Sequence, residues 1–126
     1  MIAVVNLSGR SVPTALLRRA ARAAMGRRSV TVAVLDDRGM AKLHRRHLGK
    51  WGPTDVLAFP PDQVAVCPAV ARREARERGL DWREELARYV IHGCLHLRGY
   101  RDKKPTDRKR MWATQERLLA KAGLGG

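Results

Sequence analysis

The sequence has few aromatic residues, few cysteines and no long apolar run. Aromatic side chains make up 5% of the 126 residues, so leucine, valine and alanine must fill most of a hydrophobic core. The two cysteines, Cys67 and Cys94, come without an export signal, which excludes a disulfide scaffold and predicts reduced thiols. The run over 1–5 is too short for a signal peptide, and no stretch approaches the length of a membrane span. We therefore expect a cytoplasmic protein with no membrane partner.

Acidic residues are also scarce. Asp and Glu number 12 against 26 Lys and Arg, which gives a net charge of +14. The codon bias of a GC-rich genome would explain arginine in place of lysine, but it would not explain the missing acidic residues. A field of this sign concentrates polyanions around the surface, so the charge predicts RNA or DNA as the partner.

The length fits one domain over 1–126, because two hydrophobic cores would need a longer chain. Apolar residues at 44% and charged residues at 30% exclude a disordered or collagen-like chain. Short runs rich in valine and bounded by turn residues predict strands over 2–7, 29–35, 55–59 and 63–67. Helical spacing of apolar residues predicts helices over 13–25, 37–48, 68–79, 82–98 and 106–122, the third of them a charged helix or helical loop. This order predicts an α+β fold in which about five helices cover one mixed four-stranded sheet.

Capping residues mark several helix ends. Ser11 is a candidate N-cap for the first helix, in which Pro13 would be tolerated in the first turn. Asp81 and Glu84 have the spacing of a capping box at the start of the fourth helix. Gly99 stands where a left-handed C-cap would end that helix.

The fourth helix carries the strongest chemical signal, a pair of histidines at positions i and i+4. This spacing places the imidazoles of His92 and His96 on one helix face, close enough to bind one metal ion. Asp102, just beyond Gly99, could fold back as a third ligand. Two histidines and one carboxylate would leave an open position for water, as a catalytic zinc site requires. The alternative interpretation is a pair of core or surface histidines with no metal.

Gly93 follows the first histidine, where zinc peptidases of the H-E-x-x-H type place their glutamate base. A glycine inside a helix costs about 1 kcal/mol relative to alanine, so we expect a substrate or a packed strand to approach its backbone closely. Cys94 lies on the opposite side of the helix from both histidines and is interpreted as a core thiol.

The remaining histidines and Asp55 give weaker signals. His44 and His47 are three residues apart on the second helix, but no carboxylate or cysteine at ligand spacing accompanies them. They could equally contact RNA phosphate. Asp55 precedes an apolar strand, where an aspartate often caps a turn, so we do not assign it to catalysis.

Two segments of the chain resemble a known family. The run His92-Gly93-Cys94-Leu95-His96-Leu97-Arg98-Gly99-Tyr100 is similar to the H-G-x-L-H-L-x-G-Y-D-H signature of the YbeY family of bacterial rRNA maturation factors. The run Pro53-Thr54-Asp55-Val56-Leu57-Ala58-Phe59-Pro60 is similar to that family's P-T-D-V-L-S-F-P segment. The resemblance implies a zincin-like fold, one zinc ion on the histidine helix, cytoplasmic location and metal-dependent endoribonuclease activity in the processing of small-subunit rRNA.

The chain departs from the family pattern at two places. The family motif ends in Asp-His, whereas Arg101 and Asp102 stand here, so a carboxylate replaces the third histidine ligand. An anionic ligand makes a zinc ion a weaker Lewis acid, which predicts lower or pH-shifted activity. Leu48 stands where the resemblance implies an arginine that serves RNA cleavage. Arg45 or Arg46, one turn earlier, could compensate for it.

The sequence therefore predicts a zinc-dependent hydrolase of single-stranded RNA, with water on the metal as the nucleophile and no evident side-chain base. The expected metal ligands are His92, His96 and Asp102. The expected RNA-binding residues are Arg45, Arg46, Lys50, Arg98 and Arg101. Three rivals remain: a non-catalytic ribosome-assembly factor with a weakened metal site, a metallohydrolase of another substrate class such as a peptidase, and a basic DNA-binding module.

Overall fold

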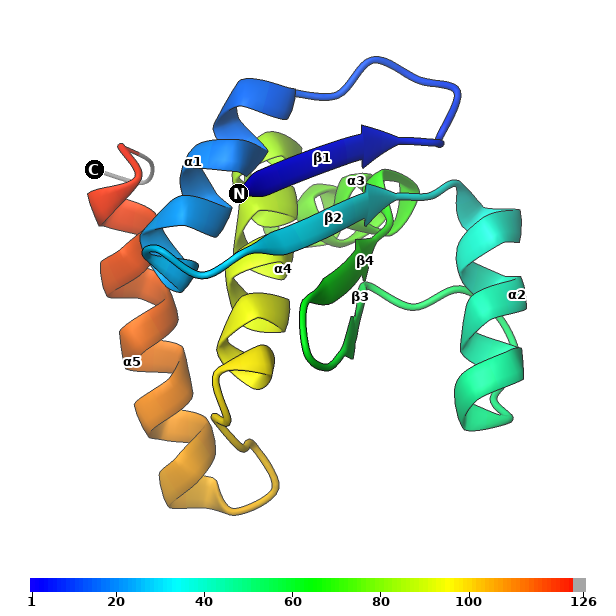
Figure 1. Cartoon of the computed structure of the whole chain (residues 1–126). Helices are drawn as coiled ribbons and strands as arrows, with labels where there is room; N and C mark the ends of the chain where they lie inside the picture. Colours follow the sequence, from blue (N-terminus) through cyan, green and yellow to red (C-terminus); the bar gives the residue numbers. More distant parts are fainter. Residues whose placement is uncertain (124–126) are drawn as a thin grey trace.

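A mixed four-stranded sheet lies at the centre of the computed structural model, which describes residues 1–123 (Figure 1). Its strands are β1 (Ile2–Asn6), β2 (Val30–Val34), β3 (Val56–Phe59) and β4 (Gln63–Val66). They are ordered β1-β2-β4-β3 across the sheet. The strands β1, β2 and β4 run parallel, and β3 runs antiparallel to β4. The predicted sheet is thus confirmed.

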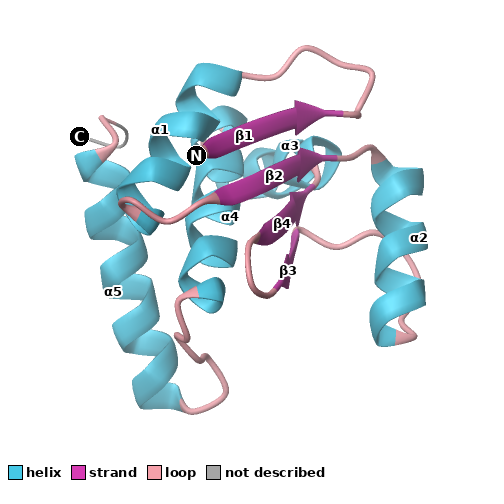
Figure 2. Ribbon diagram, viewed as in Figure 1, coloured by secondary structure: helices cyan, strands magenta, loops and turns pink. Residues whose placement is uncertain are grey.

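Five helices accompany the sheet in the described part of the chain (Figure 2). They are α1 (Thr14–Met25), α2 (Asp37–Leu48), α3 (Pro68–Arg78), α4 (Trp82–Leu97) and α5 (Pro105–Lys121). The helix α4 packs against α1, α3, α5, β3 and β4, whereas α2 lies to one side and meets α3 through the ion pair of Asp37 with Arg73. The predicted α+β class is confirmed. A single domain over 1–126 stays a prediction, and residues 124–126 lie outside the described part.

The central position of α4 follows from its sequence. Leu86, Val90, Ile91 and Leu95 are fully shielded from solvent in the hydrophobic core. Gly93 faces the sheet at very close range: a Cβ atom there would lie 2.6 Å from Cγ1 of Val64 and 2.9 Å from Cγ2 of Val56. The neighbour expected at Gly93 is therefore a pair of packed strands, which only a glycine allows to come so near.

The ends of α4 are fixed by local hydrogen bonds. At its start the Asp81 carboxylate accepts from the Arg83 amide at 2.8 Å. The predicted capping box is wrong in its second half, because Glu84 pairs with Arg88 at 2.9 Å instead of turning back to the cap. At its end Gly99 adopts a φ of 93°, so that the Tyr100 amide donates to the Leu95 carbonyl at 3.0 Å. This is a Schellman ending, and it turns the chain back across the last helical turn.

One more capping prediction is wrong. Pro13, and not Ser11, occupies the N-cap position of α1, and no side chain caps this helix within residues 1–123. The proline has no amide hydrogen that would need a partner at the helix start, and α1 begins two residues later than a Ser11 cap would place it. The helix α2 does have a side-chain cap, since Asp36 accepts from the Gly39 amide at 2.7 Å. Across residues 1–123, none of the helices combines the length and apolar character that crossing a bilayer requires.

Candidate metal centre

The last two turns of α4 and the loop after it bring three potential metal ligands together. The Nε2 atoms of His92 and His96 lie 3.1 Å apart. Oδ2 of Asp102 lies 3.3 Å from Nε2 of His96 and 3.7 Å from Nε2 of His92. The side chains are partly exposed, at 31% for each histidine and 42% for the aspartate, so an ion and a substrate can reach them. Among residues 1–123, these three side chains form a group whose ligand atoms all lie within 4.8 Å of one another and could hold a metal ion.

Hydrogen bonds behind the two rings fix their tautomers. Nδ1 of His96 lies 3.1 Å from the Tyr100 carbonyl oxygen, which can only accept, so this nitrogen carries the proton. Nδ1 of His92 lies 2.9 Å from Oε1 of Gln115. The Gln115 amide nitrogen donates to Glu116 at 3.2 Å, which directs the amide oxygen toward His92. Both Nε2 atoms therefore present lone pairs toward one another.

This arrangement fits a divalent metal ion. Two facing nitrogen lone pairs and a carboxylate oxygen repel one another unless a cation lies between them. Two ligand atoms of a tetrahedral zinc ion, each about 2.0–2.1 Å from the metal, lie about 3.3 Å apart, close to the separations of these three atoms. Three protein ligands leave one position open, as in catalytic zinc sites, and the bonds to Nδ1 are those that metal-ligating histidines make.

The position of Asp102 depends on the loop between α4 and α5. The Schellman ending at Gly99 reverses the chain, and the Tyr100 carbonyl is held by His96. From α5, Nη1 of Arg108 donates to the carbonyl oxygen of Lys103 at 2.8 Å and to that of Asp102 at 3.4 Å. The backbone that carries the third candidate ligand is therefore tied at both ends.

A network of hydrogen bonds and ion pairs holds the Gln115 side chain in place. Gln115 is only 4% exposed, and its partner Glu116 accepts from Nε of Arg88 at 3.1 Å. The same guanidinium also pairs with Glu84 at 2.9 Å and with Glu85 at 3.4 Å. Burial lowers the pKa of Arg88, but the hydrogen bond to Glu116 and the three carboxylate charges outweigh it and raise that pKa. The chain of contacts from α4 to α5 thus holds the His92 ring from behind.

The other histidines and the cysteines lie away from this cluster. Nδ1 of His44 lies 3.0 Å from the Gly52 carbonyl oxygen, and the His47 ring packs 4.7 Å from the Phe59 ring. Cys67 and Cys94 are buried free thiols, as expected. Burial raises the pKa of Cys94 to about 12, so it stays protonated in the core.

Asp55 also has the local role expected from the sequence. Its Oδ1 atom accepts from the Val56 amide at 2.7 Å and from the Thr54 hydroxyl at 3.3 Å. It therefore fixes the turn that leads into β3.

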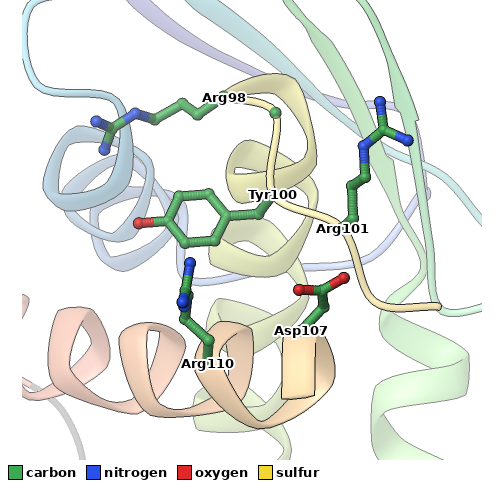
Figure 3. A pocket seen from close by; sticks show the side chains of 6 residues that line it. Arg98, Tyr100, Arg101, Asp107 and Arg110 are labelled. Carbon is green, nitrogen blue, oxygen red and sulfur yellow. The ribbon is translucent and has the colours of Figure 1, made fainter. Parts of the chain in front are cut away.

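Two of the predicted RNA-binding arginines line a cavity at the turn between α4 and α5. This cavity of about 360 Å³ is lined by Arg98, Gly99, Tyr100, Arg101, Asp107 and Arg110. Figure 3 shows Arg98 extending toward α1, Arg101 pointing the other way, and Arg110 rising from α5 toward Tyr100. Nη1 of Arg98 donates to the Ala24 carbonyl at 2.9 Å, so this arginine also ties α4 to α1. Three guanidinium groups against one carboxylate make the cavity cationic.

The other predicted RNA-binding residues lie on a separate part of the molecule. Arg45 and Arg46 are exposed on α2, and Lys50 is exposed in the loop that follows. The Arg45 guanidinium carbon lies 3.4 Å from the centre of the Trp51 ring. Leu48, where the family resemblance implies an arginine, is 56% exposed between Arg46 and Lys50. The structure thus assigns these residues to a basic surface on α2, distinct from the α4 and α5 turn.

Sequence reasoning missed the roles of Gln115 and Trp112. In the sequence, Gln115 stands among the positions of the last helix that face the core. A polar amide at such a position needs a hydrogen-bond partner, and this was the available signal. Trp112 is 55% exposed and lines two cavities together with His92 and Gln115. A large aromatic side chain on an otherwise polar helix face was the available signal.

Comparisons with known proteins point to one family. The family model for endoribonuclease YbeY matches residues 12–123. The endoribonuclease YbeY of Salinispora tropica is 34% identical, with 94% of each chain covered. That of Mycobacterium tuberculosis is 35% identical over 94% of this chain and 81% of the relative. The chain spans only 55% and 61% of the lengths of two Frankia relatives, both named endoribonuclease YbeY, at 36% identity.

The fold is similar to that of a solved structure. The solution structure of TM1509 from Thermotoga maritima matches with a TM-score of 0.71 at 27% identity. The match covers 97% of this chain and 89% of the other. With a family model that covers most of its length and a relative that aligns with it nearly end to end, the chain belongs to the endoribonuclease YbeY family.

Proposed function

We propose that the protein is a zinc-dependent endoribonuclease that cleaves single-stranded RNA in rRNA maturation and ribosome assembly. The observation that carries the proposal is the convergence of the two Nε2 atoms and the Asp102 carboxylate within a few ångströms, beside a cationic cavity. The names of the relatives support RNA as the substrate. The rRNA target and a cytoplasmic location rest on the family resemblance.

The protein's own residues have separable roles in this proposal. His92, His96 and Asp102 would hold one zinc ion per chain. A zinc ion held there would supply Lewis-acid activation of water and of the scissile phosphodiester. Gln115 and the Tyr100 carbonyl keep the protons on Nδ1, so that both Nε2 atoms stay available.

RNA binding would depend mainly on the arginines around this site. Arg101 and Arg110 line the cationic cavity at the end of α4, where guanidinium groups can bind phosphate oxygens in a bidentate manner. Arg45, Arg46 and Lys50 would bind a more distant part of the strand. The net charge of +14 favours phosphate contacts over the reading of base edges.

A non-catalytic ribosome-assembly factor is the second candidate. Leu48 and Asp102 favour it, because both stand where the family pattern has residues linked to cleavage. A peptidase is disfavoured, because Gly93 occupies the position of the glutamate base and packs against Val56 and Val64.

The deciding experiment combines metal content with RNA cleavage. Protein purified without a histidine tag is analysed for zinc and incubated with a fluorescent single-stranded RNA and with ribosomal RNA. We expect close to one zinc per chain and cleavage that His96→Ala abolishes. Zinc binding without cleavage would support the assembly factor. Cleavage that persists in His96→Ala, after chelation, would contradict the proposal.

A further inference from the structure

Trp112 is an exposed tryptophan beside the candidate metal centre. Its side chain is 55% exposed on α5, in a protein whose aromatic share is only 5%. It lies one turn after Arg108 and one turn before Gln115, on the face of α5 that looks toward His92. Core packing does not account for a large apolar side chain that stays exposed to water at this position, which favours a binding role.

Two cavities meet at Trp112, Gln115 and His92. The first, of about 240 Å³, is also lined by Asp102, Arg108 and Met111. It therefore touches two of the three candidate ligands, while an indole ring and a buried thioether form much of its wall. The cavity is small and combines flat apolar surface with a single guanidinium group.

The second cavity, of about 250 Å³, has a different character. Its charged lining consists of three carboxylates and two guanidinium groups, from Asp55, Glu74, Glu85, Arg78 and Arg88. Most of these charges are already paired with one another, as for Arg88 with Glu85 and Arg78 with Glu85. A phosphate group would find few unpaired positive charges in this cavity and would be repelled by its carboxylates. We therefore expect the RNA backbone to run along the other side of Trp112.

We propose that Trp112 stacks a nucleobase of single-stranded RNA in the first cavity, next to His92 and Asp102. The inference rests on the proposed function and specifies how the substrate is held. Every base has a π-face that can stack on an indole, so this contact binds single strands without demanding a sequence. A base held on Trp112 places the phosphodiester of the same nucleotide close to the candidate metal ligands, since base and phosphate belong to one nucleotide.

The test uses tryptophan fluorescence of metal-free protein, in which the proposed zinc-dependent cleavage does not take place. Trp51 and Trp82 are replaced by phenylalanine so that Trp112 is the sole emitter. The probes are a uridylate hexamer and a hexamer of the same ribose phosphate backbone without bases, both at low salt. We expect the uridylate to quench the Trp112 emission and the abasic hexamer to bind without quenching it.

Affinity measurements on variants complete the test. Trp112→Ala should weaken binding of the uridylate by about 5- to 160-fold, the range of one base stacked on an aromatic ring. Its affinity for the abasic hexamer should be unchanged, and Trp112→Phe should recover most of the loss. Leu80→Ala is the matched control, because Leu80 is an exposed apolar residue, 41% accessible, that lines neither cavity.

The outcomes separate this inference from the proposed function. Equal quenching by both hexamers, or binding of the uridylate without any change in Trp112 emission, would overturn the stacking site. If the zinc-loaded protein still cleaves RNA in that case, the proposed function stands. If the protein neither binds nor cleaves RNA, both fail, and a protein partner would have to account for the exposed indole.

Discussion

The Nδ1 atom of His92 lies 2.9 Å from Oε1 of Gln115, which reaches it from α5, 23 residues further along the chain. Gln115 is buried and its amide nitrogen is held by Glu116, so the amide cannot rotate freely. The His92 ring is therefore oriented by a helix that contributes no ligand of its own. Partners of this kind set the tautomer and basicity of metal-ligating histidines.

Removing this partner should weaken metal binding. We expect Gln115→Leu, which keeps the side chain's size but removes the acceptor, to lower zinc affinity by about 10- to 100-fold. The measurement is competition with a chelator of known affinity. Thr114→Val is the control, since the neighbouring side chain makes no hydrogen bond to His92. Unchanged zinc affinity in Gln115→Leu would show that the ring is held by packing alone.

The contact of Gly93 with β3 and β4 predicts a loss of stability on enlargement. In Gly93→Ala the new methyl group would meet Cγ1 of Val64 and Cγ2 of Val56 at less than 3 Å. Overpacking of this kind costs about 1–3 kcal/mol, which urea unfolding followed by circular dichroism would measure.

A double-mutant cycle can assign that cost to the strand contact. Val64→Ala removes the nearer of the two clashing side chains and leaves only the contact with Val56, so the double variant with Gly93→Ala should lose less stability than the sum of the two single variants. Met40→Ala, a core truncation on α2, should instead combine additively with Gly93→Ala. If the stability losses of Gly93→Ala and Val64→Ala were additive, the strain in Gly93→Ala would not come from the contact with Val64.

The secondary structure could be predicted because it is encoded locally. Valine-rich runs, helical spacing and glycine or proline at the ends are sufficient to find each element within about two residues. The errors lie where two local interactions compete. Pro13 takes the N-cap position that Ser11 was expected to hold, and Glu84 pairs with Arg88 instead of the N-cap.

The candidate site could be predicted only in part, for a related reason. The i and i+4 spacing of His92 and His96 fixes their geometry as soon as a helix forms, and Asp102 is close in sequence. Gln115 and Trp112 reach the site through the packing of α5 against α4, which no local pattern specifies. A tertiary contact between two helices therefore supplies the parts of the site that the sequence did not predict.

The ion pair between Asp37 and Arg73 predicts a pH-dependent contribution to stability. Two hydrogen bonds, at 2.9 and 3.0 Å, join them between α2 and α3. The hydrogen bond from Arg73 lowers the pKa of Asp37 below its ordinary value. A lowered pKa in the folded state stabilises the protein above the unfolded-state pKa, about 3.9, and this stabilisation is lost as the pH falls through the folded-state value.

We therefore expect Arg73→Met to destabilise the protein at pH 7 and to have less effect at acid pH, where Asp37 becomes protonated. Both side chains are about half exposed, so the loss at pH 7 should be at most about 1 kcal/mol. Arg76→Met, on the same helix, is the control for the loss of one positive charge. Urea unfolding of both variants across this pH range is the measurement. A difference between them that is the same at both pH values would exclude the ion pair as its source.

Asp102 is the position at which the candidate metal centre differs from the family pattern, and its removal should cost most of the zinc. Asp102→Ala leaves two protein ligands, too few for a site that holds zinc during purification. Asp107→Asn is the matched control, because Asp107 lies in the first turn of α5 and outside the His92, His96 and Asp102 group. Elemental analysis of the purified variants gives the zinc content. Full zinc occupancy in Asp102→Ala would mean that another group is the third ligand.

Asp102→His distinguishes the role of the ligand's charge from the role of its position. The substitution supplies a nitrogen donor where the family pattern has one, so we expect zinc to be retained at close to one ion per chain. A neutral ligand leaves more positive charge on the ion than a carboxylate does, which makes it a stronger Lewis acid. Cleavage of single-stranded RNA near neutral pH should therefore be faster in Asp102→His than in the unmodified protein. If zinc is retained but cleavage is absent in both proteins, the carboxylate is not what limits activity, and Leu48 becomes the residue to replace with arginine.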